Sequence, residues 1–271
     1  MKLIKQSFEF INQTDFSLVG IKKHIERCAR VSYKSEDKIT DTSYEKFVNM
    51  LESRGHDRPL EFGTVYLKVV KDEAFSQKYK NNPYSKVALK YPEGDIPNIY
   101  CVPTHFITTN YRVIKENHWE NDLQYLCEPT EYHYKRYTVH MILDRGVMDE
   151  FRTHVGLSHL AESTRYCNYS KDKFGNEITF IKPCWDIRGY NYIDYLQVAE
   201  NGYFKMLESG WTPQQARSIL PLGIKSELIS CGFEDAWENF FKRRDAPDAH
   251  PMAQEIAKPM HEEFFKLTRI S

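Results

Sequence analysis

The sequence predicts an α+β protein, a single domain in which helices pack on a mixed or antiparallel sheet. Segments with strand character are concentrated in the first part of the chain and helical segments fill the second, which favours α+β over a doubly wound parallel sheet. Glycine and proline, 12 of each, are dispersed, so no linker divides the 271 residues. A chain of this length with 41% hydrophobic residues can bury one sizeable core.

The first half begins with a short strand at 8–11, followed by helices at about 15–30 and 43–54. The first of these helices places its apolar residues near helical spacing, at Val19, Ile21, Ile25 and Cys28. β-Branched and aromatic residues predict three further strands, at 61–70, 106–114 and 136–143. The lysine-rich segment at about 72–97 is predicted to be a polar excursion from the domain, with one short helix.

The second half is predicted to be helical at 190–207, 212–220, 233–243 and 251–267. The second of these helices has a clear start, because Thr212 can cap it, Pro213 suits its first position and Gln215 can complete a capping box. The last helix places Ala253, Ile256, Met260 and Phe264 on one face.

Charge and cysteine content exclude several classes of partner. The formal net charge is −1, so no bulk attraction to nucleic acid or to an anionic membrane is expected. No segment reaches about 18 consecutive apolar residues, and the sequence therefore predicts no membrane span. The six cysteines form no C-x-x-C pair. We interpret them as reduced thiols in a cytoplasmic protein.

Polar, chemically active side chains gather at 144–170, behind the strand predicted at 136–143. The run reads DRGVMDEFRTHVGLSHLAESTRYCNYS, with histidines, hydroxyls, acids and arginines. Such a stretch after a strand is typical of a functional loop. Within it, His154 is followed by Ser158, Ser163, Arg165 and Tyr166.

This spacing resembles the signature of the flavin-dependent thymidylate synthases, in which Arg-His-Arg is followed after seven residues by Ser-x-Arg-Tyr. The resemblance extends over about residues 60–265. Other segments similar to the family are Pro59-Leu60-Glu61-Phe62-Gly63-Thr64, Thr108-Thr109-Asn110-Tyr111-Arg112, Ala216-Arg217-Ser218-Ile219-Leu220-Pro221 and 239–244.

The resemblance implies the fold of that family and its reaction. Such enzymes methylate dUMP at C5 to give dTMP, taking carbon from methylenetetrahydrofolate and a hydride from reduced FAD, with NADPH reducing the flavin. No metal is implied. The family assembles as a homotetramer whose sites draw residues from several chains, which places Asn239 and His154 of different subunits on one flavin.

Carried over position by position, the resemblance assigns roles to individual residues. Ser163, Arg165, Arg217 and Arg244 match the residues that bind the nucleotide, and Gln214 is expected to support them from the turn before Arg217. Catalysis is assigned to Arg244 and Ser163, since a cation at the former position favours ionisation of the pyrimidine N3. The residues expected to contact the flavin are His154, Ser158 and Asn239.

The chain departs from the family at Thr153 and Val155, which replace the signature arginines, and also at Phe62 and Ala161. Three hypotheses remain open for this reason. The first is a thymidylate synthase with an altered flavin site, and the second is a relative that modifies another pyrimidine nucleotide or transfers a hydroxymethyl group. The third is a non-catalytic paralogue that binds a nucleotide or a partner subunit. Each named side chain also has a structural alternative, such as a surface ion pair for Arg217.

Overall fold

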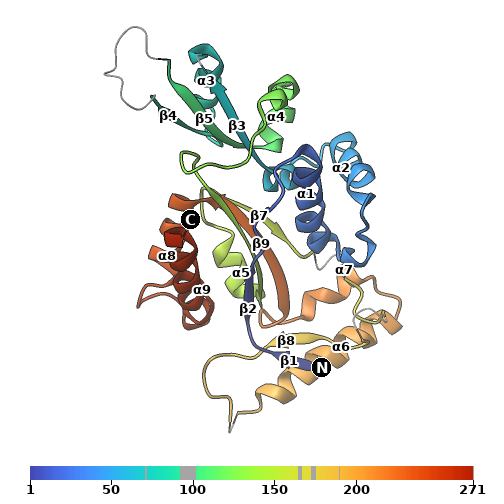
Figure 1. The fold of residues 1–271 in the computed structure, drawn as a ribbon. Helices are drawn as coiled ribbons and strands as arrows, with labels where there is room; N and C mark the ends of the chain where they lie inside the picture. Colours follow the sequence, from blue (N-terminus) through green and yellow to red (C-terminus); the bar gives the residue numbers. More distant parts are fainter. Residues whose placement is uncertain (71, 92–101, 164–166, 172–174, 189, 271) are drawn as a thin grey trace.

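The computed structural model describes residues 1–70, 72–91, 102–163, 167–171, 175–188 and 190–270. Its strands form three sheets, which Figure 1 shows one above another along the molecule. The central sheet has the order β2-β6-β9-β7, with β2 at Ser7–Phe10, β6 at Arg136–Asp144, β9 at Lys225–Phe233 and β7 at Leu157–Ala161. All its described pairings are antiparallel, which confirms the predicted α+β class.

A second antiparallel sheet has the order β3-β5-β4, with strands at Thr64–Val70, Thr104–Asn110 and Lys86–Lys90. Helices α3 (Glu73–Lys80) and α4 (Tyr111–Glu116) lie beside this sheet in Figure 1. At the other end, β1 (Lys2–Ile4) pairs in parallel with β8 (Thr179–Ile181), and α6 (Tyr192–Glu208) packs beneath them. The described strands are therefore antiparallel in two sheets and parallel in one.

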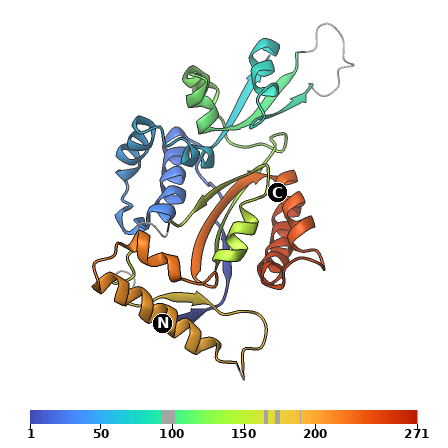
Figure 2. The ribbon, with the colours of Figure 1, turned by 180° about the vertical axis from the view of Figure 1, so that it is seen from behind.

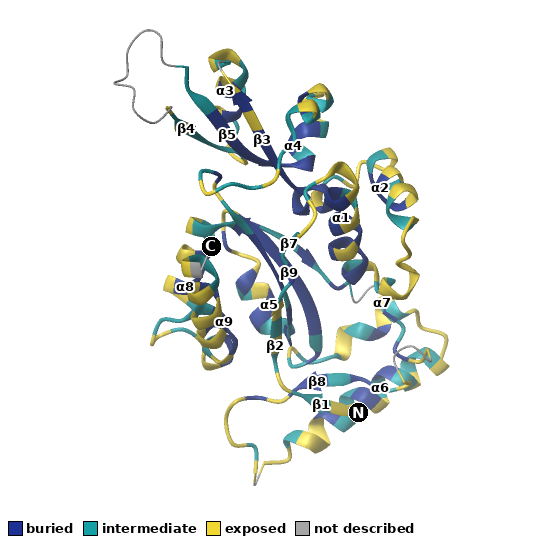
Figure 3. Ribbon diagram, viewed as in Figure 1, coloured by how far each residue is buried: buried dark blue, intermediate teal, exposed yellow. Residues whose placement is uncertain are grey.

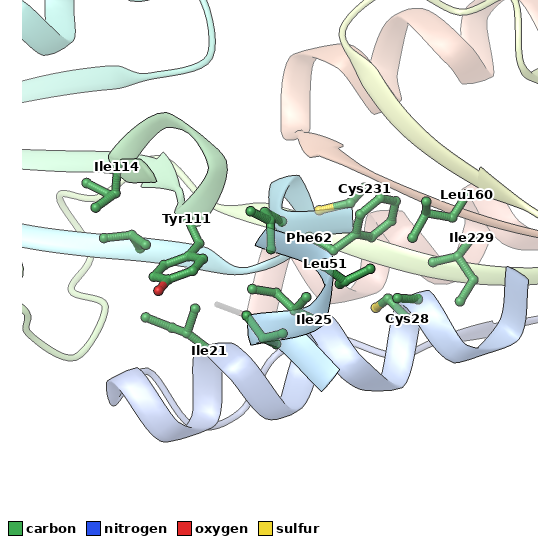
Figure 4. Packing of buried hydrophobic residues seen from close by; sticks show 14 of the residues in the cluster. Ile21, Ile25, Cys28, Leu51, Phe62, Tyr111, Ile114, Leu160, Ile229 and Cys231 are labelled. Atoms are coloured by element: carbon green, nitrogen blue, oxygen red, sulfur yellow. The ribbon is translucent and has the colours of Figure 1, made fainter. Parts of the chain in front are cut away.

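Helices cover both faces of the central sheet. On one side lie α1 (Leu18–Tyr33) and α2 (Ser43–Ser53), and their apolar residues belong to one cluster with Ile229 and Cys231 of β9. In Figure 4, Ile21 of α1 lies beside Tyr111, and Cys28 lies toward Ile229. On the other side lie α5 (Arg145–Phe151), α8 (Glu234–Arg244) and α9 (Pro251–Ile270), as Figure 2 shows from behind. Strand β9 is therefore buried along most of its length (Figure 3).

Several predicted elements agree with the structure. The helices at 15–30, 43–54, 190–207, 233–243 and 251–267 are present as α1, α2, α6, α8 and α9, with ends shifted by a few residues. The capping box at Thr212 is present, since its backbone N–H donates to Gln215 Oε1 at 2.9 Å. The helix there is short, because α7 (Pro213–Ala216) passes into a 3-10 turn at Arg217–Ile219.

The strand predicted at 106–114 is wrong in its second half. β5 ends at Asn110, whose side chain accepts a hydrogen bond from Val113 N at 3.1 Å and so begins α4. The strand predicted at 61–70 starts only at Thr64, after a 3-10 turn at Arg58–Phe62. The excursion at 72–97 contains α3 as expected and also β4, which pairs with β5, while residues 92–97 lie outside the described residues.

Strands β7 and β9 were not predicted. β9 reads KSELISCGF, a sequence with few strand-forming residues. Its position between β6 and β7 decides the conformation, because both neighbours satisfy its backbone hydrogen bonds. Among the described residues, no helix combines the length and apolar composition needed to cross a membrane.

Candidate functional site

A cavity of about 650 Å³ lies between α1, α5, β7 and the turn at Arg58–Phe62. We call it the Ser163 cavity. Its lining residues are Ser32, Tyr33, Gly55, His56, Asp57, Arg58, Pro59, Arg145, Arg152, His159, Leu160, Ala161, Glu162, Ser163 and Arg217. Predicted nucleotide ligands Ser163 and Arg217, far apart in sequence, therefore face the same space.

Positive charge dominates the lining of the Ser163 cavity. Among the described residues that line it, four are arginines, and the acids are Asp57 and Glu162. Glu162 is buried, and its carboxylate accepts a hydrogen bond from Lys225 Nζ at 3.0 Å, so its charge is compensated from behind the cavity. A cavity with this balance is suited to an anionic ligand such as a phosphate.

A buried ion network fixes the backbone that carries Ser163. Glu162 N donates to Glu227 O at 2.8 Å, which extends the antiparallel contact beyond the end of β7. The side chain of Glu227 accepts hydrogen bonds from Lys34, Lys225 and His140. Cys167 Sγ also contacts Glu162 Oε1, at 3.3 Å. The network thus connects α1, β6 and β9 to the residue next to Ser163.

Ionisation of the network follows from its geometry. Burial favours the neutral amine of Lys225, but Glu162 and Glu227 outweigh it and raise the pKa of this lysine. Burial likewise opposes the charge of Glu227, yet the hydrogen bond from His140 and the charges of Lys225 and Lys34 lower the pKa of this carboxyl. Lys225 and Glu227 are therefore both charged at neutral pH.

Gln214 lies outside the Ser163 cavity but next to it. With Arg217 and Arg145 it lines a second cavity of about 410 Å³. Both arginines line the two cavities, so they stand at the boundary between them. Gln214 is exposed, and it shares a cavity with Arg217 as the helical spacing predicts.

Arg244 and His154 form a separate group between α8 and the end of α5. Arg244 Nε donates to His154 Nε2 at 2.7 Å, and its Nη1 and Nη2 donate to the side chain and the carbonyl of Glu150, each at 2.9 Å. A guanidinium beside the C-terminus of a helix satisfies carbonyl groups that lack helical partners. Within one chain, Arg244 is not among the residues that line the Ser163 cavity.

His154 is neutral at physiological pH. It is 7% exposed, and burial together with the charge of Arg244 lowers its pKa to about 4. Because Arg244 donates to Nε2, the ring proton is on Nδ1. The ring also packs edge-on against Phe240 of α8, with the centroids 4.8 Å apart.

Ser158 and Asn239 line a third cavity, of about 420 Å³, together with Asn110 and Arg136. The hydroxyl of Ser158 donates to Glu61, which is also hydrogen-bonded by Arg112. Two of the predicted flavin ligands therefore share a cavity, and His154 lies beside α8, which carries Asn239.

The positions that depart from the family have defined environments. Phe62 is fully buried in the core beneath α1. Thr153 Oγ1 donates to Glu150 O at 2.7 Å and accepts from Arg244 Nη2 at 3.3 Å. Val155 is 89% exposed, so an apolar side chain points into solvent where the family has a cation. Ala161 lines the Ser163 cavity without a polar group.

Some expectations cannot be placed, and some lining residues were not anticipated. Arg165 lies outside the described residues. Among the residues that are described, no cluster of histidine, cysteine and acidic side chains could hold a metal ion. Arg58 and the Lys225–Glu227 pair were not singled out from the sequence. The signal for Arg58 was its position directly before the family-like Pro59-Leu60-Glu61 segment.

The structure is thus an α+β fold with an arginine-lined cavity. The sequence model of the family described as thymidylate synthase complementing protein matches residues 108–268, more than half of the 271-residue chain. The chain belongs to this family. The matched residues include β6, β7, β9 and the helices that carry Arg217 and Arg244.

A solved structure is also similar, the crystal structure of a UMP/dUMP methylase PolB from Streptomyces cacaoi bound with 5-Br dUMP. The two chains are 16% identical, with a TM-score of 0.44, and the match covers 98% of this chain and 93% of that one. No curated protein matches the sequence.

Proposed function

We propose that the chain is an enzyme that transfers a one-carbon unit to C5 of a pyrimidine nucleotide, converting dUMP to dTMP. The observation that carries the proposal is that Ser163 and Arg217, which match the family's nucleotide-binding residues, line one arginine-rich cavity. Membership of the thymidylate synthase complementing family supports the same reaction class.

In this proposal the Ser163 cavity binds the nucleotide. Arg217 and Arg145 at its boundary supply guanidinium groups that can hold a phosphate through paired hydrogen bonds. The hydroxyl of Ser163 can donate to a further phosphate or base oxygen. Arg165, which follows two residues later in the sequence, is proposed to act with them, and Gln214 to support Arg217.

The third cavity has a donor set that fits a flavin. Ser158, Asn239 and Asn110 present hydroxyl and amide groups, and Arg136 adds a positive charge, which together suit the edge of an isoalloxazine ring. FAD bound there would supply the hydride, with NADPH as the reductant and methylenetetrahydrofolate as the carbon donor. Neutral His154, fixed by Arg244, would orient this cofactor by a hydrogen bond from Nδ1.

Arg244 requires a second chain to act as proposed. Its guanidinium is bonded to His154 and Glu150 on α5, and it does not line the Ser163 cavity of its own chain. In a homotetramer, the α8 surface of one subunit can face the Ser163 cavity of another. Arg244 would then stabilise the N3-ionised pyrimidine by its charge.

A second function is favoured by the environment of positions 153 and 155. Neither Thr153 nor the solvent-exposed Val155 offers a positive charge to a flavin. Transfer of a hydroxymethyl group, or action on a different pyrimidine nucleotide, needs the nucleotide residues without the full flavin site. A chain that binds a nucleotide without turnover is the non-catalytic form of the same hypothesis.

The test is an assay of purified protein with dUMP, methylenetetrahydrofolate, FAD and NADPH, with products separated by chromatography. Formation of dTMP that requires FAD and NADPH supports the first proposal. Hydroxymethyl transfer consumes water and needs no reductant, so 5-hydroxymethyl-dUMP formed without NADPH supports the second. Arg217→Gln should lose turnover, whereas the exposed Arg54→Gln should keep it, and turnover unaffected by Arg217→Gln would refute the assigned nucleotide site.

A further inference from the structure

The arginines of the Ser163 cavity fall into two groups along α5. Arg145 and Arg152 are seven residues apart, which is two helical turns, so both lie on one face of α5 about 10 Å from each other along its axis. Asp149 lies between them, with its carboxylate oxygens 3.6 Å from Arg145 and 3.5 Å from Arg152. The carboxylate of Asp149 thus lies between the two guanidinium groups and contacts both.

Each of these arginines is joined by another part of the cavity lining. Arg145 stands with Arg217 at the boundary between the two cavities. Arg152 lies at the other end of α5, where Arg58 enters the lining from the turn before Phe62. Arg145 and Arg217 thus form one pair of cations where the two cavities meet, and Arg58 and Arg152 form another pair, since both act on His159.

His159 lies at the second pair. Its Nδ1 is 2.8 Å from Ser230 Oγ, and its Nε2 is 3.4 Å from His154 O. Burial lowers the pKa of His159 to about 4, and the charges of Arg152 and Arg58 act in the same direction. The imidazole is consequently neutral, so the positive charge near His159 comes from Arg58 and Arg152.

Of the two arginines at this end, Arg152 has a close acid, and it shares that acid with Arg145. Among the described residues, Arg152 pairs with exposed Asp149 at 3.5 Å, and Arg58 is exposed and forms no ion pair. Asp57 also lines the cavity, so Arg58, Arg145 and Arg152 outnumber the two acids beside them, Asp57 and Asp149. Two guanidinium groups that line one polar cavity can together bind an anion.

We infer that Arg58 and Arg152 form a second anion-binding subsite in the Ser163 cavity, which holds the acidic group of a second ligand while Arg145 and Arg217 hold the nucleotide phosphate. The inference rests on the proposed function for the nucleotide end. The shared chemistry of the second ligand is a phosphate or carboxylate, which FAD carries in its pyrophosphate and a folate in its glutamate tail. The subsite supplies cations that positions 153 and 155 lack.

The test measures dissociation constants of wild type, Arg58→Gln, Arg152→Gln and Arg145→Gln for four probes: FAD, riboflavin, folic acid and dUMP. The matched control is Arg54→Gln, an exposed arginine at the end of α2 that lines none of the cavities described above. Loss of one charge-assisted hydrogen bond weakens binding about tenfold or more. Circular dichroism checks that each variant is folded.

Arg58→Gln and Arg152→Gln should each raise the dissociation constant for FAD or for folic acid about tenfold, and change that for dUMP less than about twofold. Arg145→Gln should show the reverse pattern. An effect on FAD without one on riboflavin identifies the phosphates as the bound group, and an effect on folic acid identifies the carboxylates.

Four outcomes overturn the inference: unchanged affinity for every second ligand, losses equal to those of Arg54→Gln, losses for dUMP as large as those of Arg145→Gln, or a wild type that binds dUMP but neither FAD nor folic acid. The last result leaves the nucleotide site standing. A wild type that binds FAD or folic acid through Arg58 but does not bind dUMP refutes the proposed function and leaves the subsite in place.

Discussion

Replacement of Lys225 by methionine removes the cation that lies between two buried carboxylates. Lys225 Nζ donates to Glu162 at 3.0 Å and also to Glu227, and both acids are buried. Removing one partner of a buried ion pair costs about 3–5 kcal/mol, because a charge remains without compensation. Lys34 and His140 still contact Glu227, and Lys34 lies 3.9 Å from Glu162. We therefore expect the lower end of this range, about 3 kcal/mol.

Urea unfolding gives the free energy of unfolding directly. For a chain of this size, a loss of about 3 kcal/mol also corresponds to a fall of roughly 6–12 °C in Tm. Lys242→Met, an exposed lysine on α8, is the control and should change stability by less than about 0.5 kcal/mol. Lys225→Met should also weaken dUMP binding, since Glu162 precedes Ser163 in the cavity.

The deficit of Lys225→Met should shrink at low pH, because the uncompensated carboxylates can take up protons. A stability equal to that of Lys242→Met at pH 8 would refute the reasoning. Equal deficits at pH 8 and pH 5 would show that lost packing, and not buried charge, accounts for the effect.

Three other predictions concern the core and the histidines. His154 and His159 have pKa values lowered from 6.5 to about 4, so between pH 4 and pH 6.5 the unfolded chain binds more protons than the folded one. Stability should therefore rise as the pH increases from 4 to 6.5. A Tm that does not change over this range would contradict the prediction. Phe62→Ala should cost about 3–5 kcal/mol in urea unfolding, because its ring is fully buried, and a loss below about 1 kcal/mol would mean that the core refills the space. Gly232→Ala should destabilise by about 1–3 kcal/mol, since the added Cβ would lie 2.9 Å from the carbonyl oxygen of Gly156; unchanged thermal unfolding would show that β7 can shift away.

The amphipathic helices were predictable because their apolar spacing is local information. The residues of α1 that repeat at helical spacing, Ile21, Ile25 and Cys28, are those that pack against the central sheet. The N-terminus of α7 was predictable for the same reason, since Thr212 and Gln215 cap each other within four residues. The family signature was equally local, and the match of residues 108–268 confirms it.

The central strand β9 was not predictable from its own residues. Lys225 and Glu227 are charged residues, and charged residues are rarely found in a buried strand. They are tolerated because Lys34 and His140, more than 80 residues away in the sequence, complete their ion network. The end of β5 was missed although its signal is local, because Asn110 caps α4 by accepting a hydrogen bond from Val113 N, three residues later.

The site shows the same division. Sequence matching assigned Ser163, Arg217, Gln214 and Arg244 to the nucleotide, and Ser158, Asn239 and His154 to the flavin. The fold distributes them among three places: the Ser163 cavity with its neighbour, the cavity of Ser158 and Asn239, and the His154–Arg244 pair. A one-dimensional match gives no distances, so it could not show that within one chain Arg244 lies with His154 and not with Ser163.

By itself the sequence determined the α+β class, the positions of the amphipathic helices and the family, because each depends on residue types at short, fixed spacings. The tertiary structure alone decided which charged residues meet. Arg58 and Arg152 face one cavity, and Lys225 meets Glu162, only because the turn before Phe62, α5 and the β7–β9 pair converge. Electrostatic interactions act through space, so the chemistry of this site depends on contacts that the order of residues does not contain.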